Sequence, residues 1–503
     1  MSLPVHRPSL LRISLTLALA SFLPLLTAEP VSSPAPELTL RDCILRALDK
    51  NFSLKIQDFD LANSVQTLEV TKADYDPAFS ITTSKSVNQA DVPATTLVGT
   101  RSDNLSTRAG VSQKIATGAV LSLSTSLDRS STDNTFATLN PAYNADMSLS
   151  VTQPLLKGAG STVNRAAIDR AEIGVDIANL NYKGRVMQLV RDTESAYYNL
   201  VFSREQLKVR HNSLELAEKL FEENKTRKNT GVATDLDVLQ AEVGVANARR
   251  TVLLAQKDVR DAQDNLLNLI GQFEFESALG TVGLPSLDTF TPNFEASFNQ
   301  ARSNQPDYMA ATETLKQIQI DVDVAKRNNR PSLDLGGAVG YNAKDNSASR
   351  AYERLPDGDG YSWQVNLALK MPWGMRSEKA RYQSALNTLH REQMRVRQLE
   401  QNIMVQVRSA VRAVETNFES VEISGQATAL STRQYELEKA RFDAGLSTSR
   451  LVLEAQDSLE AARVAELQSR VNLRTAIAEL HRLEGSSLEH YNISVEDQLA
   501  SVR

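Results

Sequence analysis

One short segment occurs twice in this chain, and its two positions limit the possible folds strongly. The residue types Lys, Arg, Gly, Thr, Val, Leu and Ala recur at an offset of 214 residues between segments 225–241 and 439–455. Each copy lies between two long helical patterns. Gly can adopt the left-handed conformation that ends a helix, and a Thr hydroxyl can cap the helix that follows. Both segments are therefore predicted to form helical-hairpin tips, with Gly231, Thr234, Gly445 and Thr448 at the turns.

The same order of elements surrounds each tip. A helical pattern is followed by strands, then by a long helix, the tip and a shorter helix. Proline stands at each predicted strand–helix junction, namely at Pro77, Pro154, Pro331 and Pro372. We interpret the chain as a tandem repeat: a first repeat at 38–271 with strands at about 78–155, a linker at 272–293, a second repeat at 294–485 with strands at about 333–371, and a C-terminal tail at 486–503.

The predicted helix lengths indicate an elongated molecule. Each long helix spans about 67 residues, or roughly 100 Å, and each shorter one about 36 residues, or roughly 54 Å. Two short helices placed end to end would therefore match one long helix. Rods of this length must pack sideways, as a bundle, a coiled coil or a tube.

The strand patterns predict a sheet with one apolar and one polar face. In the last strand Trp363, Val365, Leu367 and Leu369 alternate with polar residues, and Trp373 follows ten residues after the first Trp. This pattern is typical of an outer-membrane barrel strand between aromatic girdles, although a soluble sandwich strand is the alternative. A few strands cannot close a wide barrel, so several copies must share one. The extra hairpin at 105–128 either widens the wall or folds outside it, and of the two we expect four strands of each copy in the wall.

The N-terminus predicts export from the cytoplasm. Basic residues precede an apolar run at 13–26, and Thr27-Ala28 follows, which is typical of a cleaved signal peptide at 1–28. A non-cleaved anchor is the alternative. Residues 29–37 are predicted to be a flexible arm. Any later membrane crossing is expected to use strands.

Composition and motifs argue against an enzyme. The net charge is −6, and basic residues do not cluster with aromatic ones, so nucleic acid is not an expected partner. The chain has five His and one Cys, and it lacks the HExxH, GxSxG, Walker and dinucleotide motifs. Residues 357–360 (Asp-Gly-Asp-Gly) fit a surface turn better than a calcium loop. We expect no catalytic residue, cofactor or metal.

Together these features resemble the TolC family of outer-membrane efflux proteins over nearly all of residues 38–485. The marks are the repeated element order, Gln-Pro-Leu-Leu at 153–156 and Gly-Val-Ala-Thr-Asp-Leu-Asp at 231–237. The resemblance implies a homotrimer with a shared β-barrel in the outer membrane of a Gram-negative-type bacterium and a long α-helical barrel in the periplasm. It implies a passive exit duct of a tripartite efflux or type I secretion system, opened at its periplasmic tips. The implied partners are a periplasmic adaptor (membrane fusion) protein, an inner-membrane transporter and outer-membrane lipid.

The resemblance also implies roles for residues at the tips, beside the neighbouring acidic Asp235. Asp237 matches an acidic position that can tie neighbouring helices, and Glu454 matches one of two acidic positions that form carboxylate rings. The other ring position is Leu451. Phe442 stands at the position of a gating tyrosine, and Ser447 at that of a gating arginine, with Arg450 close by in the sequence. Taken singly, each residue could also be an ordinary hairpin residue.

A different class of function remains as the alternative. The long helices could form a non-conducting periplasmic coiled coil that serves as a structural or adaptor protein of the cell envelope. The amphipathic strands argue against this alternative, because a soluble coiled-coil protein is not expected to carry a lipid-facing apolar band.

Overall fold

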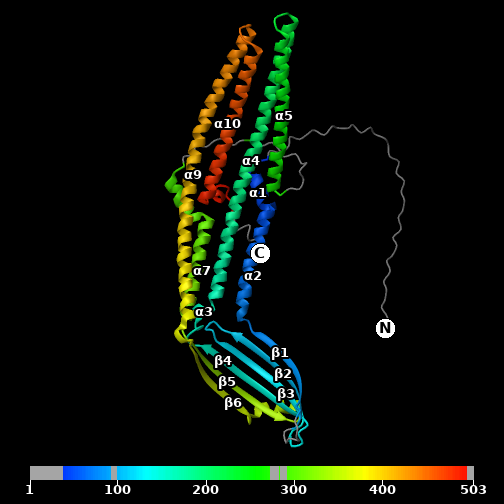
Figure 1. The fold of residues 1–503 in the computed structure, drawn as a ribbon, viewed down its shortest axis with the longest axis vertical. Helices are drawn as coiled ribbons and strands as arrows, with labels where there is room; N and C mark the ends of the chain where they lie inside the picture. The colour runs from blue at the N-terminus through cyan, green and yellow to red at the C-terminus, as the bar shows by residue number, and fades with distance from the viewer. Residues whose placement is uncertain (1–37, 92–98, 272–282, 284–291, 495–503) are drawn as a thin grey trace, which may run out of the picture.

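The computed structural model describes residues 38–91, 99–271, 283 and 292–494. The predicted signal peptide, the arm and most of the linker lie outside these residues. Long helices occupy one end of an elongated molecule and a single sheet occupies the other (Figure 1). Among the residues described, no helix is both long enough and apolar enough to span a membrane.

The helices follow the predicted order, with two of them broken. The longest are α4 (Ala166–Asn229) and α9 (Arg376–Asp443). Each leads through a tip into a shorter helix, α5 (Asp235–Leu269) or α10 (Ser449–Glu484). The remaining helices are α1 (Leu40–Lys50), α2 (Phe52–Lys72), α3 (Ser161–Asn164), α6 (Phe294–Asn304), α7 (Pro306–Asn328), α8 (Ala348–Glu353) and α11 (Ser487–His490), with short 3-10 turns at Ala73–Tyr75, Leu355–Asp357 and Trp373–Met375.

Segments 38–73 and 294–328 each show one continuous helical pattern in the sequence, but the structure breaks each of them into two helices. Asn51 separates α1 from α2, and its side-chain oxygen accepts the amides of Ser53 and Leu54. Gln305 separates α6 from α7, where Pro306 occupies the first helical position and disfavours a helical residue before it. Apolar spacing continues across both breaks, so periodicity alone did not reveal them.

The helices form one layer of four columns (Figure 1). The order across the layer is α2 with α5, then α4, then α7 with α10, then α9. Two apolar cores hold the layer together at mid-height. One joins α1 and the end of α5 to α4 around Val186, Leu200 and Leu266. The other joins α6 and the end of α10 to α9 around Ala301, Val407 and Leu480.

The short helices meet end to end through close backbone contacts at two glycines. At Gly271, beyond α5, φ is +67° and an added Cβ would lie 2.5 Å from the carbonyl oxygen of Lys50. At Gly485, beyond α10, φ is +76° and a Cβ would lie 2.8 Å from the backbone of Asn304. Asn51 strengthens the first joint by donating to the Leu269 carbonyl at 2.9 Å.

We expect Gly271→Ala to destabilise the fold more than Gly231→Ala does. Both glycines have positive φ, which costs a non-glycine residue about 1 kcal/mol, but a Cβ at Gly231 would meet nothing within 4 Å. The clash with Lys50 should add about 1–3 kcal/mol to the loss at Gly271. Thermal unfolding in detergent measures both variants, and equal shifts in melting temperature would contradict the close contact.

A buried carboxyl group on α4 makes stability depend on pH. Burial raises the pKa of Glu194 to about 7, although a hydrogen bond from the Tyr491 hydroxyl opposes this rise. The folded-state pKa lies above the unfolded value, so folding favours the protonated carboxyl group. The contribution of Glu194 to the free energy of unfolding is therefore complete below about pH 4.5 and is lost as pH rises through 7.

Glu194→Gln should therefore flatten this pH dependence. The variant is expected to gain up to about 3 kcal/mol over the wild type at pH 8 and little at pH 4.5. Chemical unfolding at the two pH values tests this, with Glu205→Gln as the control, because Glu205 pairs with Lys208 on the helix surface. An equal effect of Glu194→Gln at both pH values would show that folding does not raise the pKa of Glu194.

The sheet is a six-stranded antiparallel meander in the order β1-β2-β3-β4-β5-β6. Its strands are β1 (Ala78–Gln89), β2 (Arg101–Lys114), β3 (Val120–Thr132), β4 (Ala142–Pro154), β5 (Ser332–Asp345) and β6 (Tyr361–Lys370). The expectation that the 105–128 hairpin stands outside a four-stranded wall is wrong. It forms most of β2 and β3, which are hydrogen-bonded between β1 and β4.

The predicted junction residues lie where the strands meet the helices. Pro77 and Pro331 directly precede β1 and β5, Pro154 ends β4, and Pro372 follows β6. Trp373 lies in the 3-10 turn beyond β6 and not in the strand that contains Trp363. Pro372 ends the strand before it, because proline cannot donate the next ladder hydrogen bond. Both Trp side chains are exposed.

Candidate functional site at the hairpin tips

The first tip has a tightly capped turn. Gly231 adopts φ +79° after α4, and the Val232 amide donates to the Arg227 carbonyl at 2.8 Å. The Thr234 hydroxyl accepts the Asp237 amide, and the Asp237 carboxylate in return accepts the Thr234 amide at 2.9 Å. The hydrogen bonds from Thr234 lower the pKa of Asp237. Asp237 thus completes a capping box, and Asp235 pairs with Lys228 across the turn.

The second tip repeats the turn but not the cap. Gly445 has φ +75°, and the Leu446 amide donates to the Arg441 carbonyl at 2.8 Å. Thr448 occupies the N-cap position of α10, yet its side chain makes no capping hydrogen bond. The neighbouring Ser447 makes a different contact, because its hydroxyl donates to the carboxylate of Glu438 on α9. This contact joins the turn to the preceding helix.

Phe442 is the centre of the contact between the two hairpins. Its ring is buried beside Leu220 of α4 and Val452 of α10. The guanidinium of Arg227 lies over this ring at 4.0 Å from the centroid and donates to the Phe442 carbonyl at 3.0 Å. An aromatic ring without a hydroxyl thus holds a cation from the neighbouring hairpin by its π face and backbone.

Charged residues surround this stack and balance one another. Arg227 lies 3.7 Å from Asp443, and Lys439 pairs with Asp443 at 3.3 Å and with Glu223 of α4. Lys439 also lies 5.4 Å from the centre of the Phe442 ring. We call Arg227, Glu223, Lys439, Phe442 and Asp443 the tip cluster. It joins the end of α4 to the end of α9 by opposite charges and a shared ring.

Two buried hydrogen bonds extend this connection below the tip cluster. The Ser449 hydroxyl donates to the side-chain oxygen of Asn224 at 2.7 Å, and Gln456 donates to the Ser213 carbonyl at 2.7 Å. Both join α10 to α4. Separating the two hairpins would leave these polar groups without partners until water reached them, which costs about 1–3 kcal/mol per group.

The other predicted tip residues lie on the outside of the second hairpin. Arg450 pairs with Glu454 one turn along α10, and both side chains are exposed. Leu451 is half-buried beside them. The structure therefore places Phe442 inside the contact between hairpins, and places Arg450 and Glu454 on the surface of α10.

Sequence reasoning missed most of the tip cluster. Arg227 and Arg441 occupy equivalent positions in the repeated segment, but Arg441 pairs with Glu438 on its own helix, at 3.2 Å. The informative signal was the difference between the copies, because Phe442 and Asp443 replace the equivalents Lys228 and Asn229. The aromatic ring of Phe442 and the carboxylate of Asp443, both in the second segment, thus bind the Arg227 guanidinium of the first segment.

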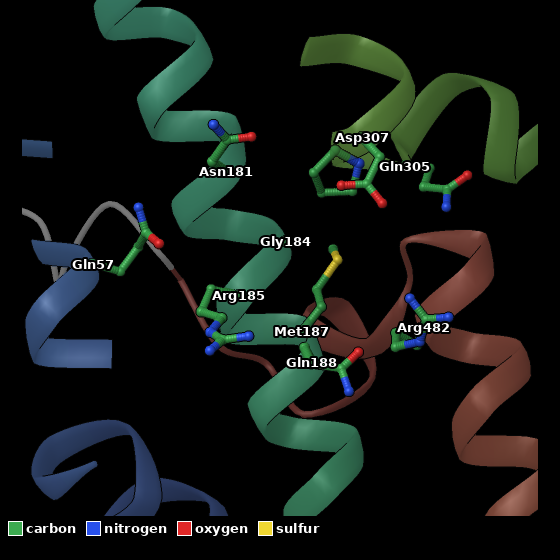
Figure 2. Close-up of a pocket in the computed structure, with 10 residues that line it drawn as sticks. Gln57, Asn181, Gly184, Arg185, Met187, Gln188, Gln305, Asp307 and Arg482 are labelled. Atoms are coloured by element: carbon green, nitrogen blue, oxygen red, sulfur yellow. The ribbon is translucent and has the colours of Figure 1, made fainter. Parts of the chain in front are cut away.

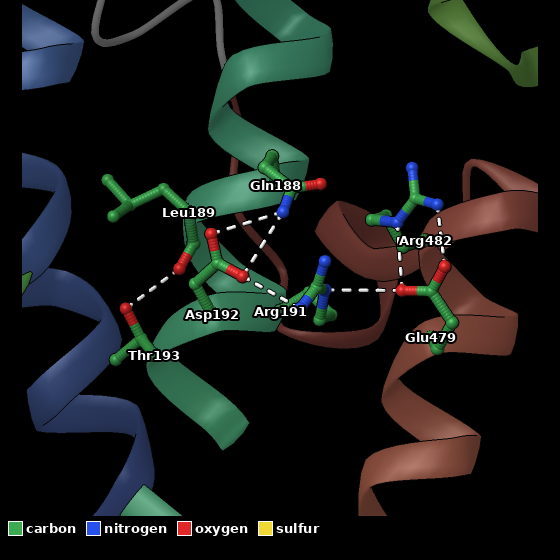
Figure 3. A network of polar contacts seen from close by, with 7 residues as sticks. All are labelled: Gln188, Leu189, Arg191, Asp192, Thr193, Glu479 and Arg482. Carbon is green, nitrogen blue, oxygen red and sulfur yellow. Dashed lines mark hydrogen bonds and ion pairs between the residues drawn. The ribbon is translucent and has the colours of Figure 1, made fainter. Parts of the chain in front are cut away.

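A second polar region lies at mid-height, where α4 meets α7 and α10. Arg191 of α4 lies 2.9 Å from Asp192 and 3.2 Å from Glu479 of α10, which also accepts from Arg482 at 2.6 Å (Figure 3). Beside it is a cavity of about 290 Å³, lined mostly by polar side chains around Gly184 (Figure 2). We assign this region to holding the columns together, since the Arg191–Glu479 pair joins α4 to α10.

Comparison with known proteins agrees with this architecture. The family described as Outer membrane efflux protein matches residues 120–272 and 298–486. The pyoverdine export outer membrane protein OpmQ of Pseudomonas aeruginosa is 25% identical over 365 residues, covering 71% of each chain. Nodulation protein T of Rhizobium leguminosarum bv. trifolii is 24% identical over 313 residues, covering 60% of this chain and 62% of its own.

Solved structures share the fold. The outer-membrane channel OprN superposes with a TM-score of 0.67 at 16% identity, covering 89% of this chain and 90% of its own. The CmeC outer membrane channel of Campylobacter jejuni gives 0.67 at 15% identity, covering 96% and 99%. Because the family match spans most of the chain, this protein belongs to the outer membrane efflux protein family, the TolC-like channels of the outer membrane that extend into the periplasm.

Proposed function

We propose that this protein is the passive exit duct of a tripartite efflux or type I secretion system, formed by three copies and opened at its periplasmic tips. Each copy would contribute two repeats to a shared barrel and a helical tube. A periplasmic adaptor protein and an inner-membrane transporter would deliver the cargo. The observation that carries this proposal is that the helical layer and the sheet are both open on the same two sides.

The open sides match along the whole molecule. The sheet ends at β1 and β6, and the helical layer ends at α2 with α5 and at α9 (Figure 1). Because β1 continues from α2 and β6 leads into α9, each open strand lies below an open helix. An unpaired strand edge exposes amide and carbonyl groups that a neighbouring copy can pair. An even number of strands makes β1 antiparallel to the β6 of the next copy.

The open helices expose apolar residues at coiled-coil spacing. On α9, Ile423, Leu430 and Leu437 are exposed at intervals of seven residues. On α5, Leu239 and Leu253 are exposed two such intervals apart. Because α9 runs toward the tips and α5 runs away from them, Leu437 and Leu239 lie at similar heights. The two rows can therefore form an antiparallel seam between copies.

Disulfide cross-linking between copies tests this assembly. Leu437→Cys combined with Leu239→Cys should give covalently linked trimers under oxidation, because α9 and α5 lie on opposite sides of one copy. Each single variant should remain uncrosslinked. Native Cys43 should not interfere, because it is buried, and burial raises its pKa to about 12.

Planar-bilayer recording tests conduction by the same trimers. A duct should give a stable ion current, whereas a non-conducting envelope protein should give none. The alternative of a soluble structural or adaptor protein also predicts extraction without detergent. A chain that is monomeric in detergent and carries no current would overturn the proposed function.

A further inference from the structure

The β2–β3 hairpin is an integral part of the apolar face of the sheet. One row of paired residues crosses all six strands and is apolar throughout, consisting of Phe79, Val111, Leu123, Leu149, Val339 and Trp363. With 14 and 13 residues, β2 and β3 are as long as their neighbours. A strand of this length spans the roughly 25 Å apolar band even when tilted by about 40°. The hairpin therefore has the length and the face of a membrane-wall strand pair.

The opposite face is polar, and one of its rows carries only small or hydroxylated side chains across the same six strands. The row beside the apolar one consists of Ser80, Gly110, Ser124, Ser148, Gly340 and Ser362. Ser124 and Ser148 are hydrogen-bonded to each other at 2.9 Å. Along this row each side chain extends no further than a hydroxymethyl group. Such short polar side chains leave room for water in front of this row.

The strand number sets the width of the barrel. Three copies with six strands each give eighteen strands, whereas four strands each would give twelve. At a strand spacing of about 4.8 Å and a tilt of about 40°, the backbone diameters are about 36 Å and about 24 Å. Barrels of sixteen to eighteen strands leave an aqueous channel.

We propose that the β2–β3 hairpin makes the outer-membrane exit a wide pore lined by polar side chains, so that the helical tips at the other end of the molecule alone limit the size of a bulky, hydrated cargo. This inference rests on the proposed trimeric duct. The inserted hairpin adds about 12 Å to the diameter of the barrel. The small side chains along the Ser and Gly row preserve that gain for the cargo at this level of the barrel.

Labelling with maleimide-polyethylene glycols of graded length measures the width from the extracellular side. The reporter is Ser148→Cys, on the polar face of β4, in the full chain and in a variant lacking residues 101–132. This deletion removes β2 and β3 together, so β1 would pair with β4 and Phe79 would face Leu149 on the apolar side. The full chain should admit polymers at least 1.5-fold wider than the deletion variant admits. Equal limits would overturn the proposal.

Two further reporters keep the test decisive if the deletion variant does not assemble. Ser124→Cys, on the polar face of β3, should react with the same size limit as Ser148→Cys, and its neighbour Leu123→Cys should stay unlabelled in lipid. Labelling of Ser124→Cys by polymers of every length would place the hairpin outside the wall and overturn the proposal. Absence of trimers and of current would instead contradict the proposed function.

Discussion

In the proposed trimeric duct, replacing Arg227 by Ala should open the periplasmic mouth and raise the open probability. Arg227 contacts the Phe442 ring, the Phe442 carbonyl and the Asp443 carboxylate, all on the neighbouring hairpin. A cation over a ring is worth about 0.5–1 kcal/mol at a partly exposed site, and a hydrogen bond from a charged donor adds to this. A total loss of about 2 kcal/mol would raise the ratio of open to closed mouths roughly 30-fold.

Single-channel recording measures this effect as open probability. Arg249→Ala is the matched control, because Arg249 pairs with Glu218 within the first hairpin and its removal also deletes one positive charge. Arg227→Lys should be intermediate, since an ammonium keeps the charge but loses the planar contact with the ring. Equal open probabilities for Arg227→Ala and Arg249→Ala would show that the tip cluster does not close the mouth.

Salt should act on the closed mouth in the same direction as Arg227→Ala. Two of the charged contacts in the tip cluster, Arg227–Asp443 and Lys439–Asp443, are partly exposed, so ions screen them. The buried pair Asn224 and Ser449 is neutral and should be insensitive to salt. A mouth that opens with salt in the wild type, but much less so in Arg227→Ala, would identify the charged contacts as the sensitive ones.

A charge on the apolar face of β6 should prevent stable insertion, whereas the same charge one residue away should not. Val365 pairs with Gly337 on the apolar face, and Gln364 pairs with Ala338 on the polar face. Arg at the bilayer midplane of a barrel costs about 2–4 kcal/mol on the lipid side. Val365→Arg should therefore lose heat-resistant trimers from the outer membrane, and Gln364→Arg should keep them.

The two variants also separate the faces by function. Gln364→Arg would place three positive charges around the lumen of a trimer and should shift ion selectivity toward anions. Reversal potentials in a salt gradient measure this shift. Similar losses of trimer in both variants would mean that β6 does not separate lipid from water, which would contradict the membrane position of the sheet.

Local chemistry was sufficient for much of the fold. Strand alternation located the two strand regions at 78–155 and 333–371, because one face had to be apolar and the other polar wherever the sheet meets two environments. The Gly–Thr segments placed both hairpin turns, because Gly231 and Gly445 must adopt positive φ. The breaks at Asn51 and Gln305 escaped periodicity, since apolar contacts with α4 and α9 continue on both sides of them.

The sequence by itself determined the long helices, the hairpin turns and the two-faced strands, because each depends on periodicity and turn chemistry within a short segment. Only the tertiary structure decided that the 105–128 hairpin joins the sheet, because a hairpin inside the sheet and one outside it can show the same alternation of apolar and polar residues. Only it brought Arg227 onto Phe442, which lies 215 residues away in the chain. Such contacts depend on how the two helical hairpins pack against each other, and no local sequence pattern predicts that packing.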